Sequence, residues 1–81
     1  MIFEIEVRIS LKPGILDPEA RAIQHALADL GFPTKRLSKA RVFSFSLEAK
    51  DRADAGETAR QMCERLLANP VIHRYEVEVR E

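Results

Sequence analysis

The chain lacks several features that small proteins use to hold a fold or to run chemistry. It contains only one cysteine among 81 residues, so no disulfide can form within it. A single unpaired cysteine is typical of a reducing compartment and favours a cytoplasmic location. The three glycines are isolated and form no phosphate-binding loop. Neither His25 nor His73 has a carboxylate or thiol at metal-ligand spacing, so no metal site is predicted.

Net charge and long apolar runs are also missing. Thirteen basic and thirteen acidic residues cancel, which argues against a dedicated nucleic-acid-binding domain. No apolar run approaches the roughly 20 residues that span a bilayer, and the first residues do not resemble a signal peptide. We therefore expect one domain over residues 1–81, without nucleic acid or membrane as a partner. So small a domain buries little surface, and its stability is marginal. We therefore expect oligomerisation or docking on a larger protein to add to that stability.

The first half of the chain carries clear local signals. Apolar side chains alternate strictly with polar ones from Phe3 to Leu11, which predicts a strand with one buried face. Asp17-Pro18-Glu19 is typical of a helix start, because Asp17 can cap free amides and proline is tolerated in the first turn. Gly31 is a plausible left-handed terminator of that helix. The apolar stripe of the helix comprises Ala20, Ile23, Leu27 and Leu30.

The second half predicts two more strands, a short edge strand and a second helix. Residues 34–38 are polar and are interpreted as the edge strand, whereas the alternation over residues 41–49 predicts a half-buried one. The second helix is capped near Asp51 and runs to Leu67. Asn69 is expected to end it in the left-handed conformation, Pro70 prevents its continuation, and a strand is expected over residues 71–80.

This order, βαββαβ, predicts an α+β fold of the ferredoxin-like kind. The expected architecture is a four-stranded antiparallel sheet with two helices on one face and the strands in the order 4-1-3-2. In that order Glu76 and Glu78 would lie beside the acidic side chains of the first strand, whereas the opposite edge would carry a basic cluster. The cluster consists of Lys35, Arg36, Lys39 and Arg41.

The search for chemistry predicts no catalytic and no cofactor-binding residue. Cys63 lies mid-helix beside the apolar stripe, without a base in register, and is interpreted as a buried structural residue. An RNA-binding sheet would present aromatic side chains outward, but Phe43 and Phe45 take the inward register. We interpret the basic cluster, with Glu76 and Glu78, as a surface for a partner or a second copy. A homodimer or homotetramer would set acidic against basic halves.

Several runs resemble the PurS family, the small subunits of the phosphoribosylformylglycinamidine synthase complex. The opening Val7-Arg8-Ile9-Ser10-Leu11-Lys12-Pro13-Gly14-Ile15-Leu16-Asp17-Pro18 is similar to the family's first strand and helix start. The run Leu66-Leu67-Ala68-Asn69-Pro70-Val71-Ile72, followed by Tyr75, is similar to its last helix and strand. The chain departs from the family's pattern at Glu19-Ala20, at Ser38 and at His73. The resemblance spans nearly the whole sequence.

The resemblance implies a non-catalytic assembly subunit in purine biosynthesis. Its complex is an ATP-dependent carbon-nitrogen ligase that uses glutamine to convert formylglycinamide ribonucleotide into formylglycinamidine ribonucleotide. A glutaminase subunit and a large synthetase subunit would be the partners, and they would use the glutamine, ATP and Mg. This chain would bridge them and assist ammonia transfer. The alternative is an ACT-type small-molecule-binding regulatory module, whose ligand would sit at the loop Lys12-Pro13-Gly14-Ile15-Leu16.

Overall fold

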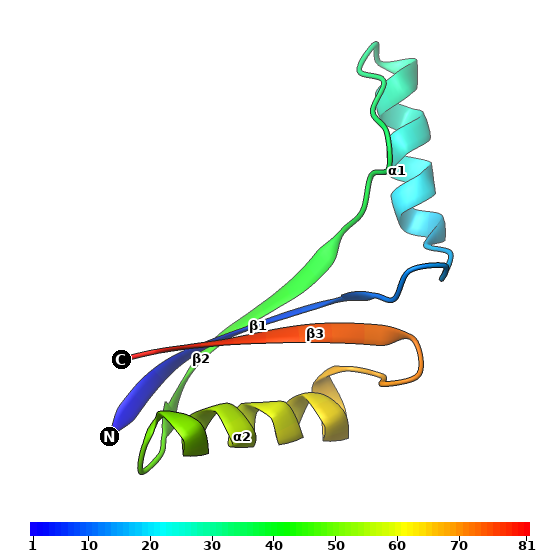
Figure 1. Cartoon of the computed structure of the whole chain (residues 1–81). Coiled ribbons are helices and arrows are strands. Elements are labelled where there is room, and N and C mark those ends of the chain that lie inside the picture. The colour runs from blue at the N-terminus through cyan, green and yellow to red at the C-terminus, as the bar shows by residue number, and fades with distance from the viewer.

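The computed structural model describes every residue from Met1 to Glu81 and contains three strands and two α-helices (Figure 1). A five-residue π-helical segment, η1, directly follows the second helix. In chain order the elements are β1 (Ile2–Leu11), α1 (Pro18–Asp29), β2 (Ala40–Glu48), α2 (Arg52–Met62), η1 (Cys63–Leu67) and β3 (His73–Arg80).

The three strands form one antiparallel sheet in the order β2-β1-β3. Strand β1 lies in the middle, where Val7 is opposite Phe43 on one side and Val77 on the other. Alternate side chains of β1 point to the same face, as the sequence predicts, and they form the centre of the core. Phe3, Ile5, Val7 and Ile9 are all at most 3% exposed.

Helix α2 covers this buried face (Figure 1). Asp51 caps it by accepting a hydrogen bond from the Asp54 amide at 2.8 Å, which confirms the predicted start. Ala55 and Ala59 of α2, and Cys63 at the start of η1, are small and fully buried. Because β2 and β3 both run antiparallel to β1, the path β2-α2-β3 is a βαβ unit split by β1. Neither helix has the length and apolar content that crossing a bilayer requires.

Helix α1 does not cover the sheet, so the prediction of two helices on one face is wrong. Figure 1 shows α1 projecting beyond one end of the sheet, and its only buried residue is Ala20. The chain measures 51 × 25 × 15 Å, with a radius of gyration of 16.1 Å, against about 12 Å for a compact domain of this length. Asp17 and Gly31 nevertheless bound the helix as predicted: Asp17 accepts from the Ala20 amide, and Gly31 has φ 93°.

The predicted edge strand over residues 34–38 is also absent, and the sheet has three strands rather than four. This segment follows α1 instead. The Phe32 amide donates to the Leu27 carbonyl at 2.8 Å, and the Gln24 side-chain amide donates to the Thr34 carbonyl at 2.8 Å. With its backbone held against the helix, the segment rejoins the sheet only at Ala40.

The turn between η1 and β3 differs from its prediction as well. Asn69 is not left-handed, since Arg36 is the only non-glycine residue with positive φ. The helix instead ends in the π-helical turn, and the Ala68 amide donates to the Cys63 carbonyl at 2.8 Å. The Asn69 side chain accepts a hydrogen bond from the Val71 amide at 3.0 Å. This bond stabilises a tight turn that includes Val71, so the strand begins at His73 rather than at Val71.

Candidate functional site

The apolar face of α1 has no partner within the chain. Ile23 is 41% exposed and Leu30 is 71% exposed, and Phe32, just beyond the helix, is 64% exposed. Ile23 and Leu30 belong to the stripe that predicts a buried helix face. Contiguous apolar surface rimmed by polar residues marks an interaction site in proteins. The arm formed by α1 and residues 32–39 therefore offers a surface for another polypeptide.

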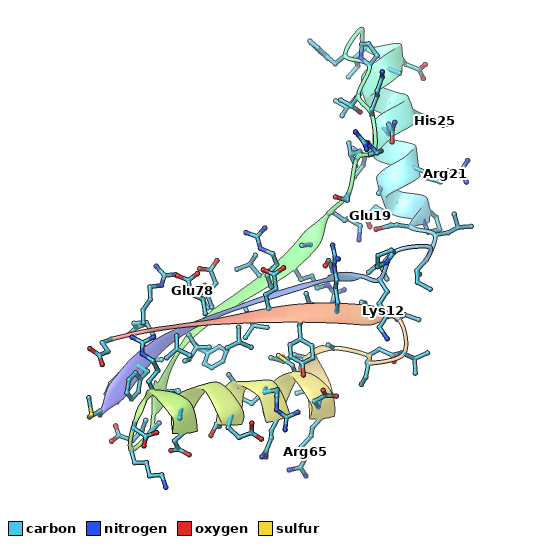
Figure 2. All side chains as sticks on the ribbon, viewed as in Figure 1. Lys12, Glu19, Arg21, His25, Arg65 and Glu78 are labelled. Atoms are coloured by element: carbon cyan, nitrogen blue, oxygen red, sulfur yellow. The ribbon has the colours of Figure 1, made fainter.

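The junction between this arm and the sheet, here called the elbow, consists of residues 12–17 and 37–39. A cavity of about 330 Å³ opens at the elbow and is lined by four cations and one carboxylate. The cations are Lys12, Arg21, Lys39 and Arg74, and the carboxylate is Asp17. Figure 2 shows Arg21 on α1 and Lys12 where β1 leaves the sheet. The fold thus gathers basic residues that are up to 62 positions apart in the sequence, from Lys12 to Arg74.

Asp17 is already engaged by the chain. Its carboxylate accepts from the Ala20 amide at 3.1 Å and lies 3.3 Å from the Lys39 ammonium. The hydrogen bond from Ala20, supported by Lys39, lowers the pKa of Asp17 below its ordinary value. Lys12, Arg21 and Arg74 have no carboxylate within 4.0 Å. Three cations at the elbow therefore remain available for an anionic group.

A second cavity, of about 420 Å³, lies in the corner between α1, β2 and the end of η1. Leu16, Leu67, His73 and Arg41 are among its lining residues. The Asn69 amide donates to Nδ1 of His73 at 2.9 Å, so this histidine stabilises the turn before β3. The wall of this cavity combines apolar side chains with charged ones and suits a protein surface better than a small polar ligand.

The structure brings together only part of the predicted basic cluster. Lys39 and Arg41 flank the start of β2 and line the larger cavity. Lys35 and Arg36 lie on the arm beside α1, away from the sheet, because residues 34–38 form no strand. No basic hairpin edge exists, and neither of these two residues lines a cavity described above.

The predicted acidic residues lie where the strand order places them. Glu78 is directly opposite Glu6, and Glu76 is opposite Arg8. Arg80 reduces the negative charge of this face, with 2.7 Å to Glu6 and 3.3 Å to Glu78. The face is therefore less acidic than the alternation alone indicates.

Cys63 is completely buried, as its place beside the apolar stripe predicts. Burial, with a smaller contribution from Glu64, raises the pKa of the thiol and keeps it protonated. His25 is exposed on α1 (Figure 2). No group of three or more His, Cys, Asp or Glu side chains is placed to hold a metal ion. At the helix-opening loop, the Lys12 and Ile15 amides already donate to the Ile72 and Lys12 carbonyls.

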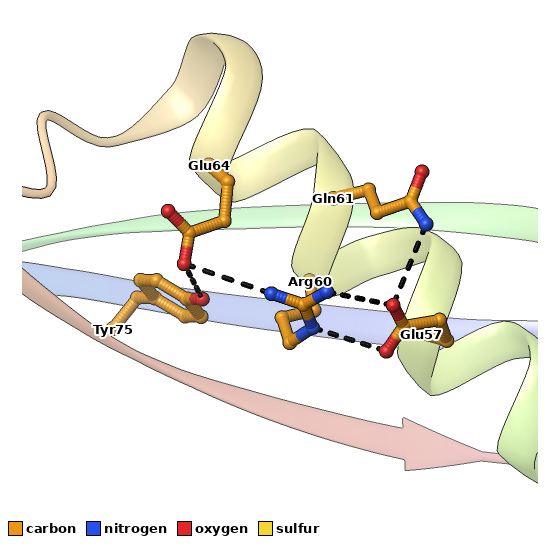
Figure 3. Close-up of polar contacts among 5 residues, drawn as sticks. All are labelled: Glu57, Arg60, Gln61, Glu64 and Tyr75. Atoms are coloured by element: carbon orange, nitrogen blue, oxygen red, sulfur yellow. Dashed lines mark hydrogen bonds and ion pairs between the residues drawn. The ribbon is translucent and has the colours of Figure 1, made fainter.

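A polar network along α2 and η1 connects the end of the helix to β3 (Figure 3). Arg60 donates to both carboxylate oxygens of Glu57, at 2.7 and 3.0 Å, and lies 3.7 Å from Glu64. The Tyr75 hydroxyl donates to Glu64 at 2.6 Å. Arg60 and Gln61 together lower the pKa of Glu57 to about 2. Spacings of three and four residues signal the helical part of this network, but nothing local signals the contact with Tyr75.

The elbow cations were not singled out from the sequence. Lys12 directly follows β1, Arg21 lies on α1 and Arg74 lies on β3, so the three cations form no charge run. Only the position of α1 against the end of the sheet brings them to one cavity. The one local signal was the break at Lys12-Pro13-Gly14, which locates the elbow but not its charge.

The sequence matches one family model over residues 4–81, that of PurS, described as phosphoribosylformylglycinamidine (FGAM) synthase. The phosphoribosylformylglycinamidine synthase subunit PurS of Methanothermobacter thermautotrophicus is 42% identical over 81 residues, which are 100% of this chain and 96% of that protein. The subunit of the same name from Bacillus subtilis is 36% identical, and the match covers 99% of this chain and 95% of that one.

Solved structures agree with these relatives. A PurS subunit of FGAM synthetase superposes with a TM-score of 0.88 at 42% identity, covering 95% of this chain and 92% of the other. A chain in the structure of PurLQS from Thermotoga maritima superposes with a TM-score of 0.89 at 29% identity, covering 98% of both chains. Such agreement over nearly the full length extends to the projecting α1 as well as to the sheet.

Proposed function

Since the chain belongs to the PurS family, we propose that it is the small, non-catalytic assembly subunit of a phosphoribosylformylglycinamidine synthase complex. In this role it bridges a glutaminase subunit and a large synthetase subunit in the cytoplasm. The complex carries out the ATP- and glutamine-dependent conversion of formylglycinamide ribonucleotide to formylglycinamidine ribonucleotide in purine biosynthesis. The observation that carries the proposal is the match over nearly the whole length to PurS subunits, among them a chain of the assembled PurLQS.

The arrangement of side chains supports a role in assembly rather than in chemistry. The only thiol is buried and protonated, whereas the apolar face of α1 and the charged elbow are exposed. In this proposal the partner subunits hold the ATP, Mg and glutamine. The present chain assists ammonia transfer by holding the glutaminase and the synthetase in the correct relative position.

The proposal includes a dimer or tetramer of this chain. Leu30 and Phe32 expose 71% and 64% of their surface, and a second copy would remove them from water. Ala20 is the only residue of α1 that the chain itself buries. Lys39 and Arg41 of one copy and Glu76 and Glu78 of the other supply complementary charges at the periphery of such an interface.

Reconstitution with purified glutaminase and synthetase subunits tests the proposal. Omitting this chain should abolish glutamine-dependent product formation, while synthesis from added ammonium by the synthetase should be retained. Size-exclusion chromatography should show the three chains eluting together. Cys63→Ser serves as a control for chemistry and should leave turnover within a few-fold of the wild type. A chain that neither co-elutes nor changes glutamine-dependent turnover would contradict the proposal.

A further inference from the structure

The register of the sheet brings two of the elbow cations together. Ser10 of β1 is directly opposite Arg74 of β3, so both side chains lie on the face of the sheet that α2 does not cover. Lys12 follows two residues after Ser10, and its amide continues the pairing with a 2.8 Å bond to the Ile72 carbonyl. Because side chains two residues apart along an extended chain share a face, Lys12 and Arg74 lie on the same face. The first turn of α1 adds Arg21 to the same cavity wall.

Three of the four cations that line this cavity of about 330 Å³ are free to bind an anion. The fourth, Lys39, lies 3.3 Å from Asp17, which is the only carboxylate in the cavity wall. Since that pair is neutral as a whole, the remaining cations, Lys12, Arg21 and Arg74, leave the wall strongly positive. Cations gathered at one concave place attract an anion more strongly than isolated surface cations do.

The donors at the elbow match a phosphate group better than a single carboxylate. Arg74 donates from Nε to the Ser10 hydroxyl at 3.2 Å, which holds the guanidinium in place and leaves its terminal nitrogens without a partner in the chain. Arginine forks and lysine ammonium groups are common protein ligands of phosphate. Gly14 also lines the cavity, and its amide donates to no backbone carbonyl. Donors from separate segments surround a tetrahedral dianion better than they surround two coplanar oxygens with a single charge.

We propose that the elbow is a phosphate-binding site, in which Lys12, Arg21 and Arg74 hold the phosphate group of a small molecule. The group is inorganic phosphate or the phosphomonoester of a nucleotide, because the same cations recognise both. The three side chains come from the end of β1, from α1 and from β3, so a bound phosphate joins the arm to the sheet and holds α1 in one direction. The site goes beyond the proposed function, which gives this chain no ligand of its own.

Titration of the isolated, isotope-labelled chain with inorganic phosphate at constant ionic strength tests the site. The amide resonances of Gly14 and Arg21 should shift saturably, with a dissociation constant of about 1 mM or below, whereas that of Gly56 on α2 should not move. Acetate, which carries one charge, should bind at least tenfold more weakly. A ribonucleoside monophosphate distinguishes the two sources, since tighter binding than inorganic phosphate identifies a nucleotide and equal or weaker binding identifies free phosphate.

Three double variants assign the binding to these side chains. Lys12→Gln with Arg74→Gln removes two of the cations and should weaken phosphate binding at least tenfold. Lys12→Arg with Arg74→Lys keeps the charge and should bind within a few-fold of the wild type. The matched control, Lys50→Gln with Arg65→Gln, removes two exposed cations that do not line the cavity and should bind as the wild type does. Circular dichroism checks that each variant is folded.

Three results would overturn the inference. The first is the absence of a saturable shift with either phosphate compound in the millimolar range. The second is acetate binding as tight as phosphate binding, which would mean that the elbow does not select a dianion. The third is an equal loss of binding in the control variant, which would mean that only the overall charge matters. Each of these leaves the proposed function standing, because co-elution with the partner subunits tests that function separately.

Discussion

Helices α1 and α2 begin in the same way but end in opposite environments. Each has an aspartate cap, Asp17 or Asp51, and each carries an apolar stripe. On α2, the small residues Ala55 and Ala59 face the sheet and are fully buried, although Leu66 of the same predicted stripe is 85% exposed in η1. The stripe of α1 is bulkier, yet Ile23 is 41% exposed and Leu30 is 71% exposed. An amphipathic helix thus has a face that needs covering, but its pattern does not identify the surface that covers it.

The largest expected effect comes from truncating equivalent side chains in the two regions. Ile5→Ala removes a side chain that is 2% exposed and should lower the free energy of unfolding by about 2–5 kcal/mol. Ile23→Ala on α1 should cost about 1 kcal/mol or less at a concentration where the chain is monomeric. Urea denaturation of both variants measures the difference. Equal costs would contradict the description of α1 as an arm outside the core.

Self-association should show the opposite sensitivity. Leu27→Asp places a charge in the stripe of α1 and should weaken oligomer formation at least tenfold, because an unpaired carboxylate would have to be buried at the interface. Ala22→Asp, on the opposite face of the same helix, is the matched control and should leave self-association unchanged. Sedimentation velocity at several concentrations provides the measurement. An oligomer that tolerates Leu27→Asp would show that another surface joins the copies.

A smaller effect is expected at the turn before β3. Asn69→Ala removes the hydrogen bond from the Val71 amide and should cost about 1 kcal/mol, which lowers the melting temperature by roughly 4–8 °C in a domain of this size. Asn69→Asp keeps an acceptor at the same place and should melt close to the wild type. An unchanged melting temperature in the alanine variant would show that the side chain contributes nothing to the turn.

The smallest effect concerns acid. Arg60 and Gln61 lower the pKa of Glu57 from 4.5 to about 2 in the folded chain. Because the folded pKa is the lower one, this interaction stabilises the fold above about pH 4.5 and is lost as the pH falls toward 2. Glu57→Gln should therefore flatten the decline in melting temperature between these values. Since the pair is exposed, 1 M salt should remove most of the difference between variant and wild type.

Some of these features follow from residues next to one another in the chain. The alternation from Phe3 to Leu11 specifies the buried face of β1, because a one-residue shift would expose every apolar side chain. Asp17, Gly31 and Asp51 determine helix boundaries through bonds and dihedral angles within a few residues. The burial of Cys63 follows in the same way from its place in the helical stripe. The antiparallel sheet, with the last strand beside the first, could likewise be predicted.

Other features depend on contacts between segments far apart. Residues 34–38 form no strand because the chain after α1 is held against the helix by the bonds from Phe32 to Leu27 and from Gln24 to Thr34, and no propensity of the segment itself indicates those contacts. Asn69 is a residue type that often ends helices in the left-handed conformation. The π-helical turn before it and its hydrogen bond to the His73 ring hold it in another conformation. The departure of α1 from the sheet in turn decides where Lys12, Arg21 and Arg74 meet.

The sequence alone therefore determined where the two helices begin and which face of each of the three strands is apolar, because those signals act over a few residues. Tertiary structure alone decided that α1 lies outside the core and that four cations share one cavity at the elbow. The position of an amphipathic helix depends on the surface against which its apolar stripe packs. No surface within this chain covers Ile23 and Leu30 of α1, so no pattern along the 81 residues specifies where that helix lies.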